Sequence, residues 1–153
     1  FIKYINDWNI VVILGLNNPN IKKIRNWIDK NPNKNVVLKI NPVNMAQIMA
    51  SCKFAILGGG TTIFEAARLG VPAILIPLAN NQINQCIGWD KLGVMVEVSN
   101  IDNFNEKKFR YYLNLFMKDD SLVHKMSTKA KRIVDAYGVK RIVERFLINE
   151  RNN

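Results

Sequence analysis

The chain carries a short apolar run that breaks into three consecutive glycines and then into a helix-forming segment. The run Phe54–Leu57 has the length and composition of a buried strand. Gly58–Gly60 can make a tight turn and let a ligand approach the backbone closely, because no Cβ atoms intervene. The helix that follows would present its free N–H groups and the positive end of its dipole to that turn. This arrangement predicts an anion site, and phosphate is its natural ligand.

Apolar runs alternate with helical patterns along most of the chain. We expect strands at Asn9–Leu14, Val36–Ile40, Phe54–Leu57, Ala73–Ile76 and Val94–Val98. Several are rich in Val and Ile and apolar on both faces, as in a parallel sheet covered by helices. After Ser99 the pattern is wholly helical, in the segments Phe104–Met117, Ser121–Tyr137 and Val139–Ile148. The sequence therefore predicts an α/β fold with one doubly wound, mainly parallel sheet and C-terminal helices, in which ligands bind at the carboxyl ends of the strands.

Helix boundaries are predicted from caps and helix breakers. Asn18 is the expected cap, and Pro19 the first residue, of the helix after the first strand. Asn44 is expected to cap a helix that starts at Met45. Glycines are expected to end or separate the later helices: Gly70, Gly93 and Gly138.

Length and composition predict one globular domain over residues 1–153, because 153 residues with 48% hydrophobic content suffice for a single core. The chain begins with Phe1 rather than Met. The spacing of Phe1, Ile2, Ile5 and Trp8 is typical of the apolar face of a helix already under way. We therefore expect the chain to be a C-terminal fragment of a larger protein.

The cysteines and the hydropathy of the chain indicate the cellular compartment of the protein. Cys52 and Cys86 form neither a disulfide framework nor a metal-ligand spacing, so we expect free, packed thiols in a reducing cytoplasm. No apolar run approaches the ~18 to 20 residues that a membrane span requires, and no secretory signal opens the chain. These features predict a soluble, cytoplasmic protein, and no motif indicates a cofactor or a metal.

The formal net charge of +10 has more than one explanation. Many basic residues lie on the polar faces of predicted helices, as on solvated surfaces: Lys22, Lys23, Arg25, Lys125, Lys129, Lys131, Arg132, Lys140, Arg141 and Arg145. Attraction to an anionic membrane surface or to nucleic acid would also use such charge, although no recognised nucleic-acid motif is present and we expect no nucleic-acid partner. A non-enzymatic interaction module that binds an anionic surface or polymer through basic helices stays open.

The residues after the glycines narrow the chemistry. No Walker lysine follows the turn, and the spacing is not that of a dinucleotide fingerprint, which argues against an ATPase and a dehydrogenase. Thr62 and Glu65 match a capping box, so they could merely satisfy backbone donors at the helix start. A second loop, Pro77–Gln82, would bring neutral amides to the same sheet edge. Paired glycine and amide loops favour a site for hydroxyl and phosphate groups.

The same residues resemble the C-terminal domain of GT-B-type proteins that bind UDP-sugars. The motifs are Gly58-Gly-Gly-Thr-Thr-x-x-Glu65, Gly70-Val-Pro72, Ile76-Pro-Leu-Ala-Asn-Asn-Gln82, Asn44-Met-Ala46, and Asp135-Ala-Tyr-Gly138 with Arg141-Ile-Val-Glu144. The nearest likeness is to the UDP-diacetamido-trideoxy-altropyranose hydrolases of pseudaminic acid biosynthesis and to spore coat polysaccharide biosynthesis proteins. The peptidoglycan N-acetylglucosaminyltransferase is more distantly similar. The resemblance implies the Rossmann-like half of a GT-B fold.

The resemblance also implies roles for individual residues. Glu65 would accept hydrogen bonds from the ribose hydroxyls. The diphosphate would be held by backbone N–H and hydroxyl groups of Gly59, Gly60, Thr61 and Thr62. The uracil would be lined by Val43, Asn44 and Met45, and the distal phosphate or sugar would be approached by Asn81 and Gln82. Met45 is equally well explained as a core residue, and Asn81 as a helix cap.

The activity implied is that of a nucleotide-sugar hydrolase in surface polysaccharide or nonulosonic acid biosynthesis. The same-fold alternative is a glycosyltransferase, in which an acceptor hydroxyl replaces water. In the hydrolase family the general base is a histidine of the N-terminal domain, whereas His124 is the only histidine here and lies on a predicted C-terminal helix. We therefore expect no catalytic residue in this chain, an inactive fragment by itself, and an N-terminal domain as its partner. The family's domain should also begin with a further glycine-ended strand, which we expect to precede this chain.

Overall fold

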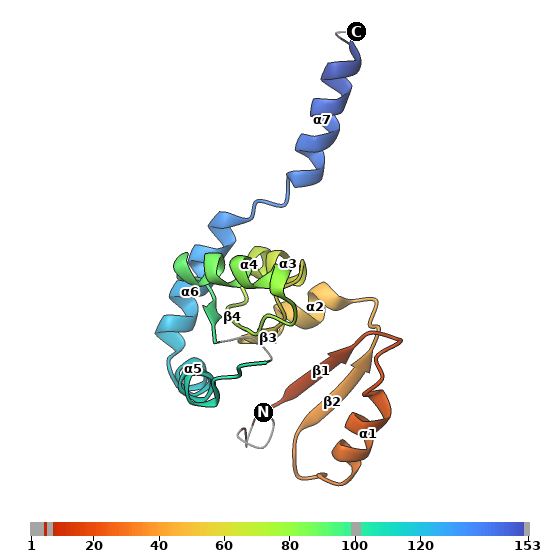
Figure 1. Ribbon diagram of the computed structural model, residues 1–153, viewed down its shortest axis with the longest axis vertical. Coiled ribbons are helices and arrows are strands. Elements are labelled where there is room, and N and C mark those ends of the chain that lie inside the picture. The colour runs from red at the N-terminus through yellow and green to blue at the C-terminus, as the bar shows by residue number, and fades with distance from the viewer. Residues whose placement is uncertain (1–4, 6–7, 99–101, 152–153) are drawn as a thin grey trace. The chain divides into compact units, whose positions relative to one another are not determined.

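The computed structural model describes residues 5, 8–98 and 102–151, with side chains through residue 147. It contains two compact units, Phe1–Met45 and Ala46–Asn153, which are described one at a time (Figure 1). In the helix predicted at the amino end, the described residues Ile5 and Trp8 lie outside helices, so the prediction is wrong for them. Phe1 and Ile2 lie outside the described residues, as does Ser99.

Unit 1 is built on two parallel strands. β1 (Ile10–Leu14) and β2 (Val36–Ile40) pair in register over their whole length and are connected by α1 (Ile21–Asp29). Both strands agree with the prediction. β1 is followed directly by Gly15, and a Cβ atom there would meet nothing within 4 Å. A glycine-ended strand is therefore present near the start of the chain, and the further one expected to precede the chain stays a prediction.

Helix α1 begins later than predicted. The side-chain oxygen of Asn18 accepts a hydrogen bond from the backbone N–H of Asn20 at 2.9 Å. Asn18 therefore closes a turn ahead of the helix instead of capping it, which is a common use of asparagine. The cap position is Asn20, without a side-chain cap bond, and the first helical residue is Ile21.

Unit 2 holds a three-stranded parallel sheet in the order β3-β4-β5. The strands are β3 (Ala55–Leu57), β4 (Ala73–Leu75) and β5 (Val96–Glu97). The helices are α2 (Met45–Ala50), α3 (Thr62–Leu69), α4 (Asn80–Lys91), α5 (Glu106–Lys118), α6 (Asp120–Ile133) and α7 (Gly138–Arg151). The first residue of α2 belongs to unit 1. The alternation of strands and helices, followed by C-terminal helices, confirms the predicted α/β class.

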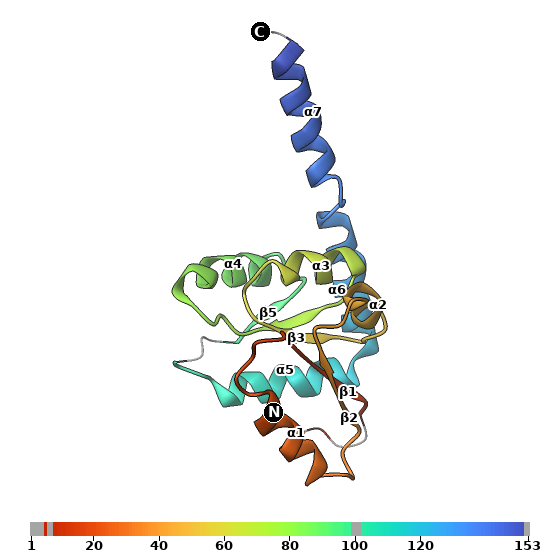
Figure 2. The ribbon, with the colours of Figure 1, turned by 90° about the vertical axis from the view of Figure 1, so that its right-hand side faces the viewer.

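The core of unit 2 surrounds the central strand β4, whose three residues are all 0% exposed. Figure 2 shows α3 and α4 along one side of the sheet and α5 along the other. The apolar face of α5 contributes three buried side chains: Phe109, Leu113 and Phe116. Because helices cover both faces of the sheet, the prediction of a doubly wound parallel sheet is confirmed for this unit.

The sheet differs from the prediction in its extent. The sequence predicts one continuous sheet, whereas the described strands form one sheet in each unit. Strand β5 is also shorter than the expected Val94–Val98. Val94 and Met95 are nonetheless 0% exposed. Their apolar character therefore reflects burial in the core and not strand pairing, a distinction that an apolar run alone does not make.

The break before α7 is set by Asp135 and not by Gly138, which is the first residue of that helix. The Asp135 carboxylate accepts a hydrogen bond from the backbone N–H of Tyr137 at 3.0 Å and pairs with the Arg141 guanidinium. These bonds lower the pKa of Asp135 to about 2, with Arg141 making the larger contribution. Ala136, between Asp135 and Tyr137, adopts a left-handed conformation with φ 62°. The motif noted in the sequence is thus a helix-start turn.

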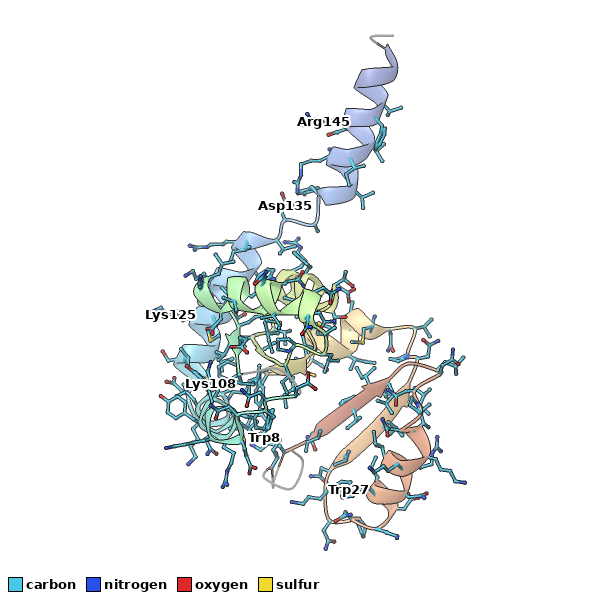
Figure 3. The ribbon with its side chains drawn as sticks, viewed as in Figure 1. Trp8, Trp27, Lys108, Lys125, Asp135 and Arg145 are labelled. Atoms are coloured by element: carbon cyan, nitrogen blue, oxygen red, sulfur yellow. The ribbon has the colours of Figure 1, made fainter. Side chains whose placement is uncertain are left out.

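Exposed helix faces carry the basic residues named above, all ten of which are exposed. Figure 3 shows Lys125 pointing outward from α6 and places Arg145 on α7. Large apolar side chains of α7 are exposed as well, among them Val139 and Phe146. Nowhere in the described ranges is a helix both long and apolar enough to cross a membrane. The distribution of charge agrees with solvated helix faces.

Candidate functional site

The glycine turn lies at the carboxyl end of β3, directly before α3, as predicted. The second and third glycines of the turn have different surroundings. A Cβ atom on Gly59 would lie 2.5 Å from Cβ of Gln82 and 2.8 Å from Sγ of Cys86, so this glycine is required by the packing of α4 against the turn. A Cβ atom on Gly60 would meet nothing within 4 Å. Gly60 therefore borders open space, where a ligand can approach the backbone.

Helix α4 joins the glycine turn to the second loop. Oε1 of Gln82 accepts hydrogen bonds from the backbone N–H groups of Gly59 and Leu78, both at 2.9 Å. Nε2 of Gln85 donates to the carbonyl oxygens of Gly59 at 2.9 Å and Gly60 at 3.2 Å. The prediction that the two loops meet at one sheet edge is confirmed. Gln85 was missed, although its spacing of three from Gln82 puts both side chains on one helix face.

The predicted capping box at the start of α3 is wrong. The cap position is Thr61, with helical angles of φ −63° and ψ −23° and no side-chain cap bond. Thr62 is already the first helical residue. A capping box needs a non-helical cap residue followed three positions later by the acidic residue, and Glu65 is four positions after Thr61. Thr62 and Glu65 are therefore not used as a reciprocal cap.

The start of α3 leaves polar groups available. The backbone N–H groups of Gly60, Thr61 and Thr62 have no hydrogen-bond partner in the described part of the chain. The Glu65 side chain, in the first turn of α3, is exposed and makes no hydrogen bond or ion pair within the same residues. Unpaired donors at a helix N-terminus attract anions. A carboxylate one turn away adds an acceptor for hydroxyl groups.

Comparison with known proteins identifies the domain. Residues 3–136 match the model of the glycosyltransferase family 28 C-terminal domain. The chain belongs to this family. The family 28 domain is the Rossmann-like half of a GT-B fold, and the resemblance that the motifs carried is confirmed.

The relatives of this family 28 domain are longer proteins. Over 92 residues it is 36% identical to the pseudaminic acid cytidylyltransferase and UDP-2,4-diacetamido-2,4,6-trideoxy-beta-L-altropyranose hydrolase of Helicobacter pylori, a match covering 59% of the chain and 18% of the relative. Over 138 residues it is 22% identical to the spore coat polysaccharide biosynthesis protein SpsG of Bacillus subtilis, covering 90% of the chain and 40% of the relative. The chain thus spans less than half the length of either relative.

A solved structure shows the same fold. The crystal structure of Acinetobacter baumannii MurG superposes with a TM-score of 0.70 at 16% identity, over 90% of the chain and 41% of that protein. Identity this low supports the architecture and leaves the chemistry to the residues of the site.

The remaining predicted site residues of the family 28 domain are placed as follows. Asn81 is the second residue of α4 and exposed, while the cap position is Ala79 without a side-chain cap bond, so Asn81 is not a helix cap. Val43 and Asn44 are exposed in unit 1, and Met45 is partly buried at the start of α2. That these three residues line the uracil stays a prediction.

His124 lies at the opposite edge of the sheet from the glycine turn. It is exposed on α6 and lines an open pocket of about 320 Å³ together with Lys53 and Gly70. Lys53 precedes β3 and Gly70 precedes β4, so this pocket lies at the amino ends of the strands. The glycine turn lies at their carboxyl ends, and that His124 is not the general base stays a prediction.

Cys86 lies beneath the glycine turn. It is 0% exposed, and burial, with a smaller contribution from the Glu97 carboxylate, raises the pKa of its thiol to about 11. Cys52 is partly exposed, and both cysteines are free, as predicted. At pH 8 a thiol with this raised pKa is ionised to only about one part in a thousand, and thiolate is the reactive form.

We expect the two thiols of the folded protein to react at different rates. With a disulfide reagent at pH 8, Cys52 should react readily and Cys86 only after unfolding in guanidinium. Counting reacted thiols over time before and after denaturation checks this, with Cys52→Ser to assign the fast phase. Equal rates for both thiols in the folded protein would contradict the burial of Cys86 under the turn.

Proposed function

We propose that this chain is the UDP-sugar-binding domain of a nucleotide-sugar hydrolase that acts in surface polysaccharide or nonulosonic acid biosynthesis. The observation that carries the proposal is the set of unpaired N–H groups at Gly60, Thr61 and Thr62, next to the partnerless carboxylate of Glu65. Such a set suits a ligand with phosphates and adjacent hydroxyl groups, as a nucleoside diphosphate has.

Each part of the ligand has a candidate partner. The diphosphate binds the three free N–H groups and the hydroxyls of Thr61 and Thr62. The ribose hydroxyls donate to the Glu65 carboxylate. Gly59 shapes the turn and gives no donor, because its N–H is already bonded to Gln82. The sugar or distal phosphate lies near the amides of Asn81 and Gln82, and the uracil near Val43, Asn44 and Met45.

One relative favours hydrolysis of the nucleotide-sugar, whereas the family as a whole favours transfer of the sugar. The Helicobacter pylori relative includes a UDP-sugar hydrolase in its name. The family favours the alternative, the donor-binding domain of a glycosyltransferase. In both cases the groups that activate water or an acceptor come from a further, N-terminal domain.

The free thiols Cys52 and Cys86 support a reducing, cytoplasmic setting.

Removal of the Glu65 carboxylate tests the ribose contact. We expect Glu65→Ala to raise the dissociation constant for UDP by about 10-fold or more, because a charge-assisted hydrogen bond contributes roughly 1.5–3 kcal/mol. Calorimetric titration and thermal shift with UDP, CDP, GDP and ADP measure the affinity, since a ligand that binds only the folded state raises its stability. The matched control is Asp29→Ala, which removes an exposed carboxylate at the end of α1.

The nucleotide series decides the proposal. Preference for UDP, lost in Glu65→Ala and kept in Asp29→Ala, supports a UDP-sugar site. Equal or absent response to all four nucleotides contradicts it. Hydrolysis and transfer are then separated by assaying the full-length protein with a UDP-sugar, with and without acceptors, where transfer of the sugar to an acceptor would overturn the hydrolase assignment.

A further inference from the structure

The side chain of Gln85 holds two consecutive peptide groups of the glycine turn. Its Nε2 donates to the carbonyl oxygen of Gly59 at 2.9 Å and to that of Gly60 at 3.2 Å. Gln85 is partly buried on α4, 25 and 26 positions along the chain from these glycines. The carbonyl oxygen of Gly60 also accepts from the backbone N–H of Ile63 at 3.3 Å. Gln85 therefore orients the peptide plane of Gly59 and shares that of Gly60 with the first turn of α3.

That orientation determines where the free donors point. No peptide bond in the described structure is cis, and in a trans peptide the C=O and the following N–H point in opposite directions. Because the carbonyls of Gly59 and Gly60 point to Gln85, the N–H groups of Gly60 and Thr61 point away from it. Open space surrounds the Cβ position of Gly60, so its N–H faces a region that a ligand can enter.

The other side of the turn is held by Gln82. Its Oε1 accepts from the N–H of Gly59 and from that of Leu78, each at 2.9 Å. The side-chain oxygen of Gln82 therefore accepts from the N–H of Gly59, and the side-chain nitrogen of Gln85 donates to the carbonyls of Gly59 and Gly60. Each glutamine uses the atom that its partner requires, so an apolar side chain loses the fit at either position, and a carboxylate loses it at position 85, where a donor is needed.

We propose that Gln85, assisted by Gln82, is a positioning residue that aims the N–H groups of Gly60 and Thr61 at the phosphates of the ligand. The ligand in this proposal rests on the proposed function; the orientation of the turn does not. Glycine peptides rotate readily, because no Cβ atom restricts them. Without Gln85 the carbonyl oxygen of Gly59 is free to face the ligand, and its partial negative charge repels an anion, whereas the carbonyl of Gly60 keeps its bond from Ile63. The glutamine on α4 thereby determines whether an N–H group or a carbonyl oxygen of the turn faces the ligand.

The test compares Gln85→Met, which keeps the length of the side chain and removes the donor, with the wild-type chain. Gln85→Glu is a second variant of the same shape that accepts and does not donate. The matched control is Asn84→Ala, because Asn84 is exposed on the same helix and its side chain makes no hydrogen bond within the described residues. Residual dipolar couplings report the directions of the Gly60 and Thr61 N–H bonds without ligand, and calorimetry gives the affinity for UDP.

In both Gln85 variants we expect changed couplings at Gly60, and a smaller change at Thr61 because Ile63 still holds the carbonyl of Gly60. The dissociation constant for UDP should rise by about 10-fold, and Asn84→Ala should show none of these changes. Unchanged couplings would overturn the proposal, and so would changed couplings with wild-type affinity for UDP. If the couplings change but the wild-type chain itself shows no affinity for UDP, the orienting role of Gln85 is supported and the proposed function fails. The two conclusions are therefore tested separately.

Discussion

Phe116→Ala is expected to lower the free energy of unfolding by about 3–5 kcal/mol, the range measured when a buried aromatic side chain is removed from a core. Phe116 is 0% exposed on α5, and its ring packs edge-on against Phe54 with centroids 5.6 Å apart. The substitution removes apolar contacts and leaves a cavity between α5 and the segment that leads into β3. Urea denaturation followed by circular dichroism measures the change.

The control for this substitution lies on the same helix. Tyr111 is 63% exposed and contacts Tyr112 edge-on, so Tyr111→Ala should cost less than about 1 kcal/mol. A similar loss of stability in both variants would contradict the assignment of the α5 face around Phe116 as core. A loss for Phe116→Ala below about 1 kcal/mol would do the same.

Gly59→Ala should destabilise the fold by about 1–3 kcal/mol, the cost of inserting a methyl group into a packed site. The added Cβ would lie 2.5 Å from Cβ of Gln82 and 2.8 Å from Sγ of Cys86. Cβ of Gln82 is fixed to the backbone of α4 and cannot rotate away, so α4 must move away from the turn. The hydrogen bonds from both glutamines to the turn would lengthen, and we expect the affinity for UDP to fall together with stability.

Gly60→Ala provides the matched comparison. A Cβ atom at Gly60 meets nothing within 4 Å, so stability should stay within about 1 kcal/mol of wild type. Affinity for UDP should nevertheless fall, because the methyl group occupies the space through which the ligand reaches the backbone. Chemical denaturation and calorimetric titration of both variants check the pair. Equal stability of Gly59→Ala and Gly60→Ala would contradict the steric distinction between these glycines.

Gly59 and Gly60 look alike in the sequence, but glycine is suited to each position for a different physical reason. Gly59 is small because α4 packs on it, and Gly60 borders open space. From the sequence alone both are glycines in a run after an apolar segment. Their different roles arise from Gln82 and Cys86, which lie 23 and 27 positions further along the chain. Substitutions at the two positions are therefore expected to affect different properties.

The start of α3 shows a second limit of local patterns. Thr-x-x-Glu predicts a reciprocal cap, and the structure starts the helix one residue too early for it, with Thr61 in helical geometry. The glutamine contacts tie down Gly59 and Gly60, immediately before Thr61. The helix therefore starts at the position where the tertiary contacts of the turn hold the backbone, and not at the position that the local capping pattern around Thr62 predicts. The freed hydroxyls and the Glu65 carboxylate are then available to a ligand.

The amino-acid sequence by itself determined the order of strands and helices, the parallel arrangement, the end of α3 at Gly70 and the glycine turn at the carboxyl end of β3. These follow from periodicity, apolar runs and turn residues, which act over a few neighbouring positions. Only the tertiary structure decided the clamp of Gln82 and Gln85 on the turn and the direction of its N–H groups. Those features depend on how α4 packs against a loop more than 20 residues away, and side-chain partners at that separation leave no local pattern in the sequence.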